Sequence, residues 1–271
     1  MARPPNWYLD PLVAAQKRQV HREWIQNNVP PGSRPGAVLK TDLFEEAYGR
    51  DELLFTLPLE SSLKIGIDVN AATAAKAADR GRALGCVFAN ADVRRLPFTD
   101  ECLDIVLSNS TLDHFETALE IEESLRELAR VLKPGGTLLV TLDNPRNPFF
   151  AVLRAAMPFA PVPYRLGKTL SMPDLLRILE RGGLEPQSTA WLIHNPRFVS
   201  TLLFLGLRRV LGDRADRPIR WLLAAFSRLD RWPTRVLTGV FLAVCARKAV
   251  YPAGEPTERR AGLAESAIAA E

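Results

Sequence analysis

The chain has 271 residues, of which 47% are hydrophobic and 24% charged, and it carries a formal net charge of +4. This is ordinary globular composition, long enough for one large domain with additions, and so mild a charge does not indicate a nucleic-acid-binding protein. Cys86, Cys102 and Cys245 are widely separated, and the three histidines show no paired spacing. The sequence therefore predicts buried thiols in a reducing compartment and no metal site.

The N-terminal stretch MARPPNWYLDPLVAAQ lacks the apolar core of a signal peptide, and no apolar run of the chain is long enough to span a bilayer. We therefore expect a cytoplasmic protein, with contact at the inner membrane face left open. Residues 9–28 place apolar side chains near helical spacing and predict a helix, followed by the breaking sequence NNVPPGSRPG. Residues 1–35 are thus expected to form an N-terminal covering segment.

Strand-like and helical segments alternate from residue 36 onward. The expected strands are AVLKTDL, LKIGIDV, CVFANAD, LDIVLSNS and TLLVTLD. Between the last two lies ETALEIEESLRELARVLK, a strong amphipathic helix that should stop at Pro134-Gly135-Gly136. Such alternation predicts an α/β domain with a doubly wound parallel sheet over residues 36–250, with its ligand at the carboxyl ends of the strands.

The composition changes after Asp143. Residues 145–170 are rich in proline and aromatic side chains, which indicates a covering segment. A helix capped by Ser171, the strand LEPQSTAWLIH, a helical insert at 196–235 and the apolar strand TGVFLAVCARK should follow. Residues 251–271 are expected to form a flexible tail.

Four pieces of the chain, in order, resemble the class I S-adenosylmethionine-dependent methyltransferases, most closely the small-molecule "type 11" group. They are IGIDVN, NADVRRLPFTDECLDIVLSNS, LARVLKPGGTLLVTLD and TGVFLAVCARK. The resemblance implies a Rossmann-like sheet of seven strands with an antiparallel last strand. It also implies S-adenosyl-L-methionine as cofactor.

The same resemblance assigns cofactor-binding residues. Asp68, at the end of the second strand, should accept hydrogen bonds from the ribose hydroxyls, and Asp92 should meet the adenine amino group. Val69, Val93 and Asn109 complete this part of the expected site. A carboxylate at a strand end suits two hydroxyl donors. The alternative for both aspartates is a role in a turn or a helix cap.

The first loop departs from the family pattern, which has an acid and two or three glycines here. Lys40 occupies the place of the acid, and Asp42 and Phe44 occupy glycine places. We expect Asp42 to bind the ammonium group of the cofactor, Lys40 or Thr41 to bind its carboxylate, and Gly49 to supply a tight turn. The alternative is a filled pocket in a catalytically silent scaffold or interaction protein.

His114, in the segment SNSTLDHF after the fourth strand, is the candidate catalytic base for an oxygen nucleophile. A packing role for this histidine is the alternative. The absence of GxGxxG in the sequence argues against a nicotinamide-dependent reductase. The expected function is methyl transfer to a small-molecule or lipid-like acceptor, with no nucleic acid as substrate because no basic surface with interleaved aromatic residues is evident.

The insert at 196–235 is both basic and apolar, and it allows two interpretations. An apolar stripe flanked by arginines marks residues 217–230. The stripe consists of Ile219, Leu222, Leu223, Phe226 and Leu229, and the flanking arginines are Arg217, Arg220 and Arg228. The stripe either faces the protein core or forms a substrate cap or an interfacial helix that meets anionic lipid.

Overall fold

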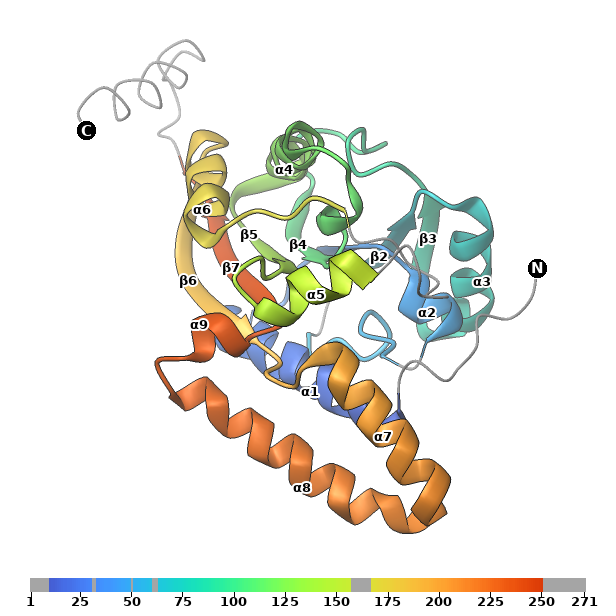
Figure 1. The fold of residues 1–271 in the computed structure, drawn as a ribbon. Coiled ribbons are helices and arrows are strands. Elements are labelled where there is room, and N and C mark those ends of the chain that lie inside the picture. The colour runs from blue at the N-terminus through green and yellow to red at the C-terminus, as the bar shows by residue number, and fades with distance from the viewer. Residues whose placement is uncertain (1–9, 31–32, 50, 60–62, 157–166, 251–271) are drawn as a thin grey trace.

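The computed structural model describes residues 10–30, 33–49, 51–59, 63–156 and 167–250. The predicted tail and part of the predicted covering segment lie outside these ranges. Within them, seven strands form one sheet in the order β3-β2-β1-β4-β5-β7-β6 (Figure 1). The strands are β1 (Ala37–Thr41), β2 (Leu63–Asp68), β3 (Cys86–Asn90), β4 (Leu103–Asn109), β5 (Leu132–Asp143), β6 (Leu184–Leu192) and β7 (Phe241–Lys248).

The topology confirms the predicted fold class. Strands β1 to β5 pair in parallel, whereas β7 lies antiparallel between β5 and β6. The central strands are almost wholly buried, as expected where helices cover both faces of a parallel sheet. The carboxyl ends of β1 to β6 therefore lie along one edge of the sheet, called here the carboxyl edge.

Helices cover both faces of the sheet (Figure 1). Helices α1 to α3 contribute to one buried hydrophobic cluster. Helices α4 and α6 contribute to a second such cluster. The helices are α1 (Pro11–Asn28), α2 (Phe44–Tyr48), α3 (Ala71–Gly81), α4 (Ala118–Val131), α5 (Pro148–Ala156), α6 (Met172–Arg181), α7 (Arg197–Leu211), α8 (Asp216–Ser227) and α9 (Arg235–Thr238).

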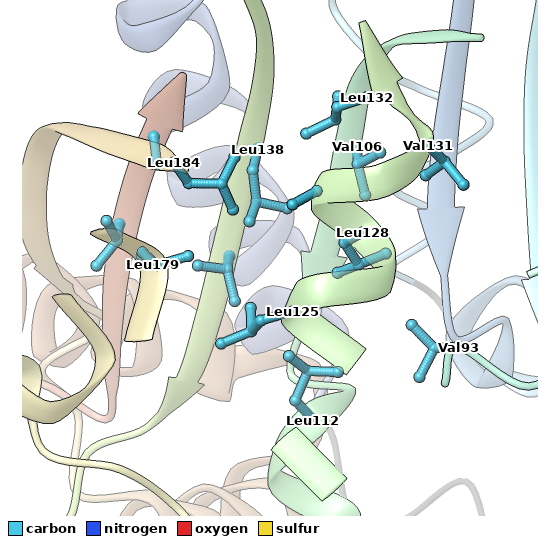
Figure 2. Close-up of a cluster of buried hydrophobic side chains, with 14 of the residues drawn as sticks. Val93, Val106, Leu112, Leu125, Leu128, Val131, Leu132, Leu138, Leu179 and Leu184 are labelled. Atoms are coloured by element: carbon cyan, nitrogen blue, oxygen red, sulfur yellow. The ribbon is translucent and has the colours of Figure 1, made fainter. Parts of the chain in front are cut away.

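Helix α4 shows how the sequence pattern builds the core. Thr117 begins it with a capping box, in which Glu120 bonds back to the cap residue. Leu125 and Leu128, spaced at nearly one turn, are buried with Val106 of β4 in the same cluster (Figure 2). Full burial of each leucine contributes about 1.5–3 kcal/mol relative to an exposed position.

The helix ends earlier than predicted. Its last residue is Val131, and β5 begins at Leu132, before the Pro-Gly-Gly sequence. Those residues instead lie where the pairing register of β4 and β5 shifts, and Gly135 adopts a φ of 76°. The conformational freedom of glycine therefore permits a backbone irregularity within the strand here, and it does not end the helix.

Helices α7 and α8 form a helical hairpin that projects from the sheet (Figure 1). Ile219 and Leu223 of α8 are buried against Phe204 of α7, and Leu12 and Val13 of α1 pack on the same cluster. The core-facing interpretation of the 217–230 stripe is confirmed. The interpretation of that stripe as a lipid-facing surface is wrong, because α7 and α1 already cover it.

Candidate functional site

The carboxyl edge brings together residues that are far apart in the sequence. Thr41 at the end of β1 pairs with Ile67 on one side and with Ser108 on the other. Asp68 ends β2, and Asn109 ends β4. The first loop and the predicted ribose and β4 residues therefore share one edge, as the parallel topology requires.

Asp68 is fixed by backbone donors on both carboxylate oxygens. The Leu43 N–H donates to Oδ2 at 2.9 Å, and the Asn70 N–H donates to Oδ1 at 2.8 Å. Each oxygen accepts about two hydrogen bonds, so one acceptor position on each remains for further donors. This carboxylate is oriented at the strand end and can bind a pair of hydroxyl groups.

Asp42 follows a backbone path typical of glycine. Its φ is 62°, in the left-handed region that most residues avoid. Its Oδ1 accepts the N–H of Phe44 at 2.8 Å, a local bond that helps an aspartate adopt this conformation. Burial, opposed by the ammonium group of Lys40, raises the pKa of Asp42 to about 6. The nearby negative charge of Asp68 also raises this pKa.

His114 lies across the edge from Asp42. It ends the 3₁₀ turn Leu112–His114, and its Nε2 lies 3.9 Å from Asp42 Oδ2. The side chain is 43% exposed and therefore reachable from solvent. Its role as a base stays a prediction, whereas the other histidines, His21 and His194, are buried.

Lys40 belongs to a buried ion pair. Its ammonium group lies 3.0 Å from Glu46 Oε2 of α2 and also donates to the carbonyl of Asp42. Burial opposes the charged form, yet the carboxylates of Glu46 and Asp42 keep the pKa of Lys40 above its usual value. Glu46 Oε1 accepts the N–H of Leu54. The sequence analysis missed this structural partner, and cofactor binding by Lys40 stays a prediction.

Two other residues of the first loop have structural roles of their own. Thr41 is fully buried, and its hydroxyl bonds Thr111 at 2.7 Å and lies 3.3 Å from the Ser108 hydroxyl. Gly49 ends α2 with a φ of −89°, so the expected glycine-type turn is not found there. A Cβ at this position would collide with Glu45, which gives the glycine a packing reason instead.

Asp92, which follows β3, is held by a neighbour. The guanidinium of Arg94 bonds both carboxylate oxygens, and it also reaches Glu120 of α4. Hydrogen bonds from the Arg94 side chain hold the pKa of Asp92 below its usual value, although burial opposes this. Asp92 and Arg94 line a hollow of about 530 Å³, together with charged residues of α4. Any further donor to Asp92 must share the carboxylate with Arg94.

The remaining predicted residues differ in exposure. Val69 is 70% exposed directly after β2, whereas Val93 is buried in the core. Asn109 lies at the end of β4, where its Oδ1 accepts the hydroxyl of Thr141 on β5 at 2.7 Å. Val93 can therefore offer a ligand only its backbone, while Val69 presents a side chain.

The sequence analysis did not select the buried carboxylate of Asp113. Its Oδ2 accepts the Ser110 hydroxyl and the Asp143 N–H, each at 2.9 Å. Asp113 does not cap α4, because Thr117 does. Ser110 has a φ of 52°, so the backbone turns sharply directly after β4. Asp113 thereby ties the β4 loop to the end of β5.

Residues 167–169 lie over the loop that follows β4. The Gly167 N–H donates to the carbonyl of Asp113, and the Thr169 hydroxyl donates to the carbonyl of Asp143. A Cβ at Gly167 would lie 2.2 Å from the Phe115 oxygen, so only glycine permits this approach. The part of the predicted covering segment that is described thus packs on the carboxyl edge.

Within the described ranges, no group of three or more potential ligand side chains could hold a metal ion. Among the same residues, no helix is long and apolar enough to cross a membrane.

Comparisons with known proteins agree with the fold. Residues 49–140 match the model of a methyltransferase domain. The ubiquinone/menaquinone biosynthesis C-methyltransferase UbiE of Ectopseudomonas mendocina is 35% identical over 105 residues, which are 38% of this chain and 37% of the relative. The chain therefore spans well under half the length of this curated relative.

Two solved structures share the fold at low identity. The [4+2]-cyclase SpnF has a TM-score of 0.54 at 22% identity, over 85% of this chain and 81% of that one. A geranyl diphosphate C-methyltransferase from Streptomyces coelicolor A3(2), solved with Mg²⁺, geranyl diphosphate and S-adenosyl-L-homocysteine, has a TM-score of 0.54 at 17% identity, over 86% and 80%. The fold is that of the class I S-adenosylmethionine-dependent methyltransferases. The match to the methyltransferase domain model covers residues 49–140, and the two solved structures extend the likeness in fold to most of the chain.

Proposed function

We propose that this protein transfers a methyl group from S-adenosyl-L-methionine to a small-molecule or lipid-like acceptor. The observation that carries the proposal is the Asp68 carboxylate, oriented at the end of β2 by two backbone N–H groups. Its remaining acceptor positions suit the two ribose hydroxyls of the cofactor.

The residues present fit both halves of the cofactor. Asp42, with a side chain that is 25% exposed, provides a carboxylate for the ammonium group of the methionine half. Asp92 provides an acceptor for the adenine amino group, which would share it with Arg94. The left-handed backbone at Asp42 also keeps the loop on a path typical of glycine. These features favour a working site over a filled one.

The chain contributes mainly position and proton transfer. When bound, the cofactor supplies a methyl group activated by a sulfonium, and a thioether leaves after in-line transfer. The carboxyl edge would align the acceptor, and close alignment is itself a large part of such catalysis. His114 Nε2 is half-exposed at this edge and would take the proton that an acceptor hydroxyl loses. Residues 167–169, packed over the β4 loop, would help exclude water.

An apolar, isoprenoid-like acceptor is the finer proposal. It is supported by the names of two similar proteins, one acting in quinone biosynthesis and one on geranyl diphosphate. A methylation assay would offer isoprenoid-substituted aromatics, small amines and bulk tRNA. Methylation of tRNA would contradict this acceptor class.

The direct test is calorimetry with S-adenosylmethionine, S-adenosylhomocysteine and NADH. We expect the first two to bind, and we expect Asp68→Ala to weaken binding by about tenfold to a hundredfold, because it removes charge-assisted hydrogen bonds. Asp79→Ala, on the exposed side of α3, is the matched control and should bind normally. No binding at millimolar ligand would favour the silent scaffold, and NADH binding would favour a reductase.

A further inference from the structure

The outer face of α7 is apolar although the inner face already packs in the core. Val199, Leu202, Leu203 and Val210 follow one another at helical spacing, and each is between 43% and 80% exposed. Phe204, on the opposite face, is buried against α8. A helix that is apolar on both faces requires a second apolar partner for its outer stripe.

Two neighbouring helices also expose apolar side chains. Helix α5 packs beside α7 and exposes Phe149 and Val152. Helix α8 exposes Trp221 to 70%. Tryptophan has an apolar ring and a polar N–H, which suits the boundary between lipid and water. The exposed residues of α5, α7 and α8 are called here the hairpin surface.

Positive charge accompanies the apolar side chains. Arg209, Arg214, Arg217 and Arg220 are exposed, and none of them forms an ion pair with another described residue. Arg208, by contrast, is bound by Asp10 and Asp216 and does not contribute. The combination is complementary to an anionic lipid surface.

We propose that the hairpin surface docks on an anionic lipid bilayer, with α7 contributing aliphatic side chains and α8 contributing arginines and Trp221. The attachment is peripheral, since no described helix could span the membrane. Helix α5 begins soon after Asp143, at the carboxyl edge, so docking brings the candidate site close to the lipid. The supply of a lipid-like acceptor from the bilayer rests on the proposed function, whereas the docking does not.

The test is co-sedimentation with vesicles of phosphatidylcholine alone or mixed with phosphatidylglycerol, without cofactor. We expect binding to the mixed vesicles only, and weaker binding as salt rises, because exposed charges are screened. Replacing Arg214, Arg217 and Arg220 together by Ala should lower the partition coefficient about a hundredfold, since each basic side chain near such a surface contributes a few-fold or more.

The matched control removes the same charge elsewhere. Arg82 lies on the turn after α3, Arg126 on α4 and Arg181 on α6. Their replacement by Ala should leave vesicle binding nearly unchanged. Leu202→Ser with Val210→Ser should weaken binding while leaving thermal unfolding unaltered, because both side chains are exposed.

Three results would overturn the docking proposal. They are no binding to anionic vesicles at low salt, an equal loss in the control variant, and a dimer that Val210→Ser dissociates without any change in vesicle binding. Cofactor calorimetry on the same samples separates this outcome from failure of the proposed function.

Discussion

Two places along the carboxyl edge, the loop after β1 and the loop after β3, hold their charged residues in different ways. In the first loop, Lys40 and Glu46 form an ion pair with side chains 4% and 0% exposed. At the end of β3, Asp92 and Arg94 form a pair with side chains 32% and 37% exposed. The first pair joins a strand to a helix, and the second joins residues two apart in the chain.

The difference between the two pairs shows how the first loop is held in place without the glycines of the family pattern. Burial makes the Lys40–Glu46 pair costly to break, so the loop depends on it for its position. The Asp92–Arg94 pair is partly exposed and screened by solvent, so it orients one side chain and little else. The proposed methionine end of the site is therefore supported by the fold, and the proposed adenine end by local contacts.

The largest effect is expected from breaking the buried pair. Lys40→Met leaves the Glu46 carboxylate buried without its counter-charge and should lower the free energy of unfolding by about 3–5 kcal/mol. Urea unfolding monitored by circular dichroism measures the change. Lys133→Met, which removes the exposed pair with Asp104, is the matched control and should cost less than about 1 kcal/mol.

A double variant sharpens this prediction. Lys40→Met with Glu46→Leu removes both buried charges and should recover part of the lost stability, although the N–H of Leu54 loses its acceptor. If Lys40→Met unfolds no more easily than the control, the buried pair does not support the loop.

A smaller effect is expected on cofactor affinity through Asp42. Only its charged form attracts an ammonium group, and its pKa of about 6 lies above that of an ordinary aspartate. The affinity for S-adenosylhomocysteine should be level above pH 7 and fall by up to tenfold per pH unit below pH 6. Calorimetry between pH 5 and 8 measures this dependence.

Asp42→Asn is the variant that isolates the charge. Asparagine also tolerates the left-handed backbone, so the loop path should remain. We expect about tenfold to a hundredfold weaker binding at pH 7 and a loss of the pH dependence below pH 6. An unchanged affinity would show that Asp42 serves only the turn.

The smallest effect is expected in the loop after β3. Arg94→Ala removes a partly exposed ion pair and should change the free energy of unfolding by at most about 1 kcal/mol. Thermal unfolding at pH 7 measures it. A loss of stability as large as that of Lys40→Met would contradict the contrast between the Lys40–Glu46 pair and the Asp92–Arg94 pair.

The fold was predictable because it depends on local patterns that the sequence carries openly. The alternation of buried strands with helices such as Ala118–Val131 indicated the doubly wound sheet, and the antiparallel last strand followed from the family resemblance. Asp68 and Asp92 were predictable as residues at or directly after strand ends. Their partners Leu43 and Arg94 were not selected from the sequence.

The rest of the site could not be predicted, because it depends on contacts between distant segments. The sequence around Lys40 does not show that a five-residue helix brings Glu46 back into contact with the Lys40 side chain. The joint burial of Asp113 with the end of β5 is equally invisible in sequence. The apolar stripe of α8 matched a lipid-facing helix as well as a core-facing one, and only its packing on Phe204 distinguishes the two.

The left-handed backbone at Asp42 has a consequence for recognising related proteins. A side chain that costs energy in this conformation occupies a path that a glycine would follow without strain. The main chain thus follows a path typical of glycine although no glycine is present. Relatives with equally altered first loops should be easier to detect by their backbone angles than by their letters.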